Sequence, residues 1–193
     1  AAMGKTVSKL SKDDLRQLRQ ATYFDKRELQ QWYKGFLRDC PLGQLSEEEF
    51  VKVYKQFFPF GDPTDYCHYL FRVFDLDNSK YIDFKEFIIA LSITSRGTEE
   101  QKINWSFKMY DYKKEGKIGY KEILPIVRAT YKMVGPMVEL PEDQQTPEAR
   151  VDRYFQLLGK DKNTDKLDLN DFKKLAQLDS GIAAALNSYL GLV

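Results

Sequence analysis

The feature that most constrains the fold is a repeat of helix–loop–helix units. In each unit an amphipathic stretch leads into an acid-bearing polar loop, which ends on an acid followed by Phe or Ile. Three copies span residues 74–87, 110–123 and 155–172, and a fainter copy spans 36–50. Apolar residues at i, i+3, i+4 and i+7 flank the loops, as in helices that bury one face. The sequence therefore predicts an all-α fold.

The spacing of the repeats predicts how the units are grouped. Asp39, Asp75 and Asp111 begin three loops at intervals of 36 residues, whereas the fourth loop follows a longer connector at 135–147 that contains three prolines. We expect two paired lobes followed by a C-terminal helix, divided as 1–97, 98–178 and 179–193.

Composition narrows the class of protein. The 193 residues, 42% of them hydrophobic, suffice for a substantial core. The net charge of +1 gives no indication of a nucleic-acid partner. Cys40 and Cys67 do not make a disulfide framework, so we expect a reduced, cytoplasmic protein. With His68 as the single histidine and no nucleophile–base constellation, we expect no enzyme activity. No secretory signal or apolar run of membrane-spanning length is visible.

The second loop matches the ligand pattern of an EF-hand calcium loop. Such a loop supplies oxygens from positions 1, 3, 5, 7 and 9 and a bidentate Glu at position 12, with Gly at position 6. The six ligand positions are filled, in order, by Asp75, Asp77, Ser79, the carbonyl of Tyr81, Asp83 and Glu86. Lys80 replaces the glycine, and a positive φ at a non-glycine residue costs on the order of 1–3 kcal/mol. The sequence predicts a weakened but working calcium site.

The third loop is a poorer match. Asp111, Glu115, the carbonyl of Lys117 and Glu122 stand at positions 1, 5, 7 and 12. Position 3 is Lys113, a cation that repels the ion where a carboxylate should attract it. We therefore expect one bound calcium ion, with a second at this weaker site as the open alternative.

The other two loops depart further from the pattern. Read from Asp39, the first loop has Pro41 at position 3 and Phe50 at position 12, so we expect a structural unit without metal. The stretch 159–171 looks like a calcium loop with one inserted residue, and we expect it to bind no ion or only a weak one.

Several short segments along the chain are typical of one family of EF-hand proteins. They are Cys40-Pro41 with Gly43-Gln44-Leu45, and residues 54–61, 94–98, 131–135, 139–142, 146–151 and 190–193. On these segments nearly all of 3–193 resembles the neuronal calcium sensor family, in its frequenin-like branch. The resemblance implies two EF-hand pairs, N-terminal myristoylation and, as in frequenins, regulation of a phosphatidylinositol 4-kinase. Family members usually have working second, third and fourth loops, from which this chain departs at Lys80, Lys113 and 159–171.

The N-terminus carries a lipidation pattern. Residues 3–8, Met-Gly-Lys-Thr-Val-Ser, fit N-myristoylation of Gly4, and Ala1 and Ala2 ahead of Met3 would prevent it. Residues 1–38 hold nine Lys/Arg against four Asp/Glu, which suits an anionic membrane surface. We expect peripheral association with the Golgi or plasma membrane.

The resemblance also implies a target groove. It is expected to take an amphipathic helix, for example from a phosphatidylinositol 4-kinase, with the C-terminal segment 182–190 as a stand-in ligand. Its expected lining residues are Trp32, Phe36, Phe50, Val53, Tyr54, Phe57, Phe87, Leu91, Trp105, Tyr110, Val127 and Tyr131. The alternative is an EF-hand adaptor, like a light chain, that binds its partner with or without calcium.

Overall fold

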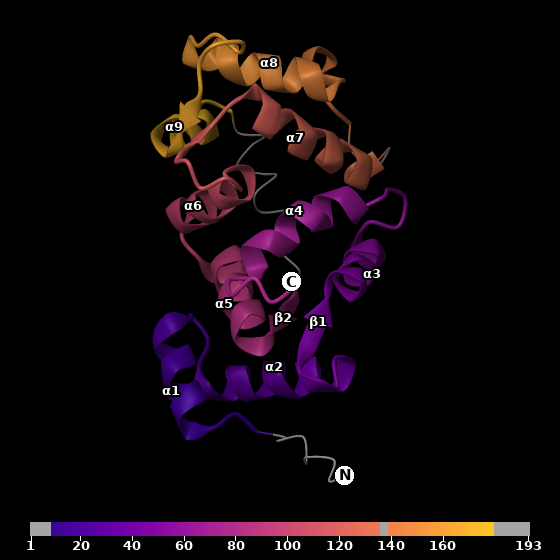
Figure 1. Ribbon diagram of the computed structural model, residues 1–193, viewed down its shortest axis with the longest axis vertical. Coiled ribbons are helices and arrows are strands. Elements are labelled where there is room, and N and C mark those ends of the chain that lie inside the picture. The colour runs from indigo at the N-terminus through magenta and orange to yellow at the C-terminus, as the bar shows by residue number, and fades with distance from the viewer. Residues whose placement is uncertain (1–8, 136–138, 180–193) are drawn as a thin grey trace.

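A computed structural model of the chain describes residues 9–135 and 139–179. Helices dominate these ranges, and the strands are only two or three residues long (Figure 1). The helices are α1 (Lys12–Ala21), α2 (Lys26–Asp39), α3 (Glu47–Phe57), α4 (Thr64–Phe74), α5 (Phe84–Arg96), α6 (Glu99–Tyr110), α7 (Tyr120–Val134), α8 (Pro147–Leu158) and α9 (Leu169–Leu178), with a 3-10 turn, η2, at Glu142–Gln144. The all-α prediction is confirmed. Gly4 and the segment 182–190 lie outside the described residues.

Two short antiparallel sheets join the loops in pairs. They are formed by β1 (Gln44–Ser46) with β2 (Tyr81–Asp83), and by β3 (Lys117–Ile118) with β4 (Leu167–Asp168). Leu45 lies opposite Ile82 in the first sheet, and Ile118 lies opposite Leu167 in the second; all four side chains are buried. Each sheet therefore couples two helix–loop–helix units, giving the two paired lobes that the repeats predict.

Local sequence signals set where the helices after the loops begin. Asp83 caps α5 by accepting the N–H of Glu86, while the Glu86 carboxylate accepts the N–H of Asp83. Asp168 and Asp171 form the same reciprocal pair at the start of α9. Such capping boxes satisfy backbone donors that the first turn of a helix leaves unpaired. The residue at the last loop position thus fixes the helix start as well as facing the loop.

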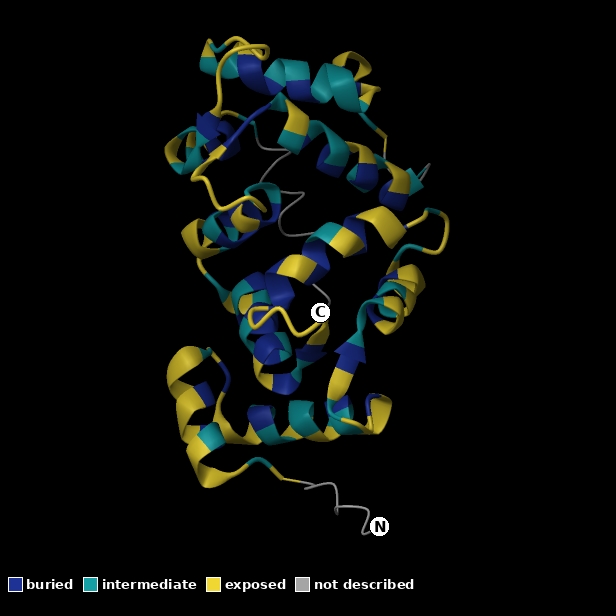
Figure 2. Cartoon of the chain, in the orientation of Figure 1, coloured by how far each residue is buried: buried dark blue, intermediate teal, exposed yellow. Residues whose placement is uncertain are grey.

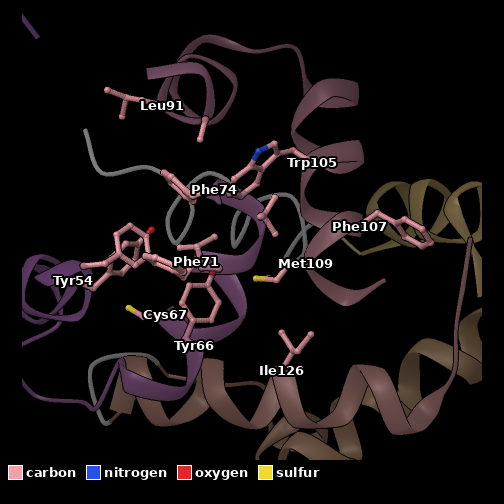
Figure 3. Close-up of a cluster of buried hydrophobic side chains, with 14 of the residues drawn as sticks. Tyr54, Tyr66, Cys67, Phe71, Phe74, Leu91, Trp105, Phe107, Met109 and Ile126 are labelled. Carbon is pink, nitrogen blue, oxygen red and sulfur yellow. The ribbon is translucent and has the colours of Figure 1, made fainter. Parts of the chain in front are cut away.

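The two lobes share a hydrophobic core centred on α4. Figure 3 shows side chains of α3, α4, α5 and α6 converging, with Ile126 of α7 facing them. Phe74 at the end of α4 packs edge-on against Trp105 of α6, with ring centroids 5.5 Å apart. Phe107 points away from this cluster in Figure 3 and packs against Phe172 of α9. Burial of α4 between the lobes therefore fixes their relative placement.

The connection between α3 and α4 also contacts the second lobe. The Asp62 N–H donates to the carbonyl of Lys132, 2.9 Å away, and Lys132 Nζ donates to Asp65. A Cβ on Gly61 would lie 1.8 Å from the carbonyl oxygen of Met133, so only glycine permits this approach.

Burial colouring in Figure 2 shows much of α1 exposed to solvent, with its buried positions on one side of the helix.

Candidate calcium site and target-binding surface

The second loop brings three acids to one point. Asp75, at the end of α4, and Glu86, in the first turn of α5, are buried, whereas Asp77 is exposed. One oxygen from each lies within 4.8 Å of the other two. Two ligands on opposite sides of one calcium ion are about 5 Å apart, because each bond measures about 2.3–2.6 Å. The three carboxylates are therefore close enough together to bind a single ion.

The backbone of this loop has the turn that a calcium loop needs. Lys80, in the position usually held by glycine, has φ +72°, close to the +75° of Gly116 at the equivalent point of the third loop. The N–H groups of Ser79 and Lys80 both donate to the Asp75 carboxylate, at 3.0 Å each. The strain expected at Lys80 is present, yet the loop keeps the shape that its ligands require.

The electrostatics around Glu86 favour a cation. Burial raises the pKa of Glu86, and the charges of Asp83 and Asp77 raise it further. The N–H groups of Asp77 and Asp83 act in the opposite direction by donating to the carboxylate, but the net pKa stays above its usual value. A bound divalent cation would remove this mutual repulsion. The residues of the second loop therefore fit calcium, with Ser79 Oγ, the Tyr81 carbonyl and Asp83 as the remaining candidate oxygen ligands. Of these, Asp83 Oδ1 also accepts the N–H of Glu86.

The third loop keeps the same backbone but contains a cation of its own. Glu115 and Gly116 donate their N–H groups to Asp111, as Ser79 and Lys80 do to Asp75. Lys113 Nζ, however, lies 3.2 Å from Glu122 Oε1 and donates to it. The carboxylate that should be the bidentate calcium ligand already has an ammonium partner in this loop.

The fourth loop corrects the sequence interpretation. Because Leu167 pairs with Ile118, it stands at position 8, and the loop runs from Lys160 to Asp171 without an inserted residue. Lys160 Nζ donates to Asp171 Oδ2 at 2.7 Å and to the carbonyl of Lys166 at 3.3 Å. The first ligand position is thus a lysine, whose ammonium contacts the groups at positions 7 and 12.

The first loop has a different register from the one read from sequence. Leu45 pairs with Ile82, so Leu45 is position 8, which makes Arg38 position 1 and Glu49 position 12. Ser46 caps α3 by accepting the Glu49 N–H, just as Asp83 caps α5. The assignment of Asp39 to position 1 and Phe50 to position 12 was wrong by one residue, because α2 continues to Asp39, past the point where the loop count begins.

Lys113 and Lys160 lower the pKa of the acid at position 12 of their loops, whereas the pKa of Glu86 at the same position of the second loop is raised. Burial raises the pKa of Glu122, but the hydrogen bonds from Lys113 and the Gly119 N–H outweigh it, and the net pKa falls below its usual value. The pKa of Asp171 is lowered in the same way, because the hydrogen bonds from Lys160 and the Asp168 N–H outweigh the effect of burial, which raises it. At the same loop position, Glu86 has the opposite net shift.

The predicted groove residues divide into three groups. Six are buried, namely Phe36, Phe50, Tyr54, Leu91, Trp105 and Val127, and five are partly buried, namely Trp32, Val53, Phe87, Tyr110 and Tyr131. Phe57 is exposed, with 52% of its surface accessible. The structure brings Trp32 and Phe36 of α2 onto Phe87 of α5, with centroids 6.4 and 5.4 Å apart. Phe50 packs instead against Phe71 and Phe74 in the core.

The structure also has a groove between the lobes that was not predicted from the sequence. It is a groove of about 940 Å³ between α3, α4 and α7, with Val51 and Pro125 among its lining residues. Charged groups around it pair locally, as Lys132 Nζ does with Asp65 at 3.1 Å. No spacing pattern in the sequence marks it, because its walls come from both lobes. None of the helices in 9–135 and 139–179 is long and apolar enough to cross a bilayer.

Comparison with known proteins agrees with this architecture. The EF-hand domain pair family matches residues 41–94 and again residues 100–177, so the chain is an EF-hand protein. Among curated relatives, neuronal calcium sensor 1 of Lymnaea stagnalis is 47% identical over 95% of this chain and 96% of its own length, and that of Aplysia californica is 48% identical over the same shares. Human recoverin is 40% identical over 88% of this chain and 86% of its own. The chain belongs to the neuronal calcium sensor family.

Proposed function

We propose that this protein is a calcium sensor that binds one ion in its second loop and passes the signal to a target helix. The observation that carries the proposal is the convergence of Asp75, Asp77 and Glu86, with oxygens within 4.8 Å of one another. Family membership supports the calcium-sensing role. The third loop, the open alternative for a second ion, is disfavoured by the contact between Lys113 and Glu122.

The helices on either side of the second loop connect the ion site to both tryptophans. Trp32 packs against Phe87 of α5, and Trp105 packs against Phe74 of α4. A change in the angle between α4 and α5 on ion binding would alter the surroundings of both rings. This coupling suits a sensor whose apolar surface opens to an amphipathic helix.

A calcium titration tests this proposal. We expect calorimetry to give one ion per chain at micromolar concentration, with a parallel change in tryptophan fluorescence. Three sites of similar affinity would contradict the reduced capacity. If fluorescence and the affinity for a target helix are the same in calcium and in chelator, the protein is the calcium-independent adaptor instead.

We further propose a lipid-modified protein at an anionic membrane, in keeping with the frequenin-like branch that regulates phosphatidylinositol 4-kinase. In a form of the protein that begins at Met3, without Ala1 and Ala2, Gly4 would carry the myristoyl group. The exposed side of α1 offers Lys12, Arg16 and Arg19. A single myristoyl chain attaches only marginally, so basic charge is the second signal needed.

Vesicle binding tests the membrane proposal. We expect the acylated protein to prefer vesicles with anionic lipid over neutral ones, and its binding to fall as salt rises, because ions screen the basic surface. Equal membrane recovery of Gly4→Ala and wild type in cells would exclude acylation at Gly4 as the anchor.

A further inference from the structure

Both loops of the second EF-hand pair contain a lysine ammonium where an ion would bind. In the third loop Lys113 Nζ donates to Glu122, and in the fourth Lys160 Nζ donates to Asp171 and to the Lys166 carbonyl. The carboxylate at position 12 and the carbonyl at position 7 are calcium ligands in a working loop. Each ammonium thus uses groups that the loop would otherwise offer to the ion.

The two lysines reach this place by different routes. Lys113 stands at position 3 of its loop and Lys160 at position 1, both positions where a working loop has an acidic ligand. The second loop also contains a lysine, Lys80, but its Nζ donates to Asn78 Oδ1 and not to Glu86. In the first loop Arg38 stands at position 1, but its guanidinium lies 3.8 Å from Asp39 and its side chain is exposed. Within the described residues, the arrangement is therefore a feature of the second pair and does not follow from having a cation in the loop.

The burial of the acids explains why a cation matters there. The side chains of Glu122 and Asp171 are 12% and 20% exposed, whereas those of Lys113 and Lys160 are 51% and 32% exposed. A fully exposed pair contributes little to stability, but an acid this far buried is costly to leave without a compensating positive charge. The loop shape is retained as well, because Asp111 still receives the N–H groups of Glu115 and Gly116.

We propose that Lys113 and Lys160 are built-in substitutes for calcium, which make the second EF-hand pair a structural lobe that is independent of the ion. The lysines hold the β3–β4 pair and the starts of α7 and α9 in place at all calcium concentrations. Calcium response is then confined to the first pair. The assignment concerns loops three and four only, so it does not depend on ion binding by the second loop.

Restoring a ligand at position 3 tests the role of Lys113. Lys113→Asp gives the third loop acids at positions 1, 3, 5 and 12 around Gly116, and we expect it to gain one calcium site by calorimetry. Lys114→Asp is the matched control, since it makes the same charge change one residue away at a position that supplies no ligand. Both variants are made in a Glu86→Gln background, so the gained site is counted whether or not the second loop binds calcium.

The outcome is decided by the number of sites. One added site in Lys113→Asp and none in Lys114→Asp supports the proposal that Lys113 takes the place of calcium. The proposal is overturned if Lys113→Asp gains no site, or if the Glu86→Gln parent already binds calcium at the third loop, which a further Glu122→Gln change would abolish.

Hydrogen exchange without calcium tests Lys160. We expect Lys160→Met to lower the protection of the β3–β4 amides, because Asp171 and the Lys166 carbonyl lose the Lys160 ammonium, and Asp171 keeps only the N–H of Asp168. Lys162→Met is the control, since Lys162 pairs with Asp152 of α8 instead. Should Lys160→Met fail to fold, wild type in calcium and in chelator gives the answer. Equal protection of the β3–β4 amides in the two conditions supports the role of Lys160, and loss of that protection in chelator overturns the proposal.

Discussion

Glu86→Gln is expected to abolish calcium binding at micromolar concentration. Glu86 is buried at the loop position that supplies the bidentate ligand in EF-hand loops, and glutamine offers one neutral oxygen in its place. Losing a ligand should weaken calcium affinity by more than the roughly 10–100-fold that is lost when a hydrogen-bonding partner of a ligand is removed. Because calcium stabilises the fold by binding it, the variant should also lose the increase in melting temperature that wild type shows on calcium addition.

The chain provides matched controls for this variant. Glu49 and Glu122 occupy the same loop position in the first and third loops, so Glu49→Gln and Glu122→Gln make the same chemical change. We expect both to keep wild-type binding, because the first loop has Arg38 and Cys40 at positions 1 and 3, where a working loop has oxygen ligands, and Lys113 already contacts Glu122 in the third loop. Calorimetry on all three variants, with circular dichroism to check folding, would show a wrong assignment if Glu86→Gln bound as tightly as wild type.

Truncating the groove aromatics is expected to weaken target binding strongly. The ligand is a synthetic amphipathic helix with bulky apolar residues at i, i+3 or i+4, and i+7. We expect Trp32→Ala or Phe57→Ala to cost about 2 kcal/mol or more if they are central anchors, which is about 30-fold in Kd. Phe57 is the cleaner test, because its exposure means that its removal leaves the core intact.

Leu42→Ala is the control for this experiment, since Leu42 is an apolar residue with 92% exposure in the first loop and is not part of the groove. Fluorescence anisotropy of the labelled helix measures the affinity, at saturating calcium and in chelator. Should both aromatic variants stay folded and keep wild-type affinity, the groove is assigned to the wrong surface.

The predicted groove residues show how much of a side chain's burial can be predicted from hydrophobic periodicity. Phe50 and Phe57 are seven residues apart on one face of α3, so sequence treats them alike. Phe50 is fully buried against Phe71 and Phe74, whereas Phe57, the last residue of the helix, is half exposed. Periodicity identifies an apolar face, but which part of that face is covered depends on where α4 crosses it.

Four helix–loop–helix units and the acidic positions of the second loop can be predicted from the sequence alone. Those features are local, because twelve consecutive residues and the helices beside them carry the whole pattern. Tertiary structure was needed to set the register of the first and fourth loops, since position 8 is defined by pairing with a strand far away in the chain, as Leu45 pairs with Ile82. It also decided where the lysines of the second pair point. A side chain as long and flexible as lysine can reach solvent or the loop centre, and the folded carboxylates, Glu122 and Asp171, select the second.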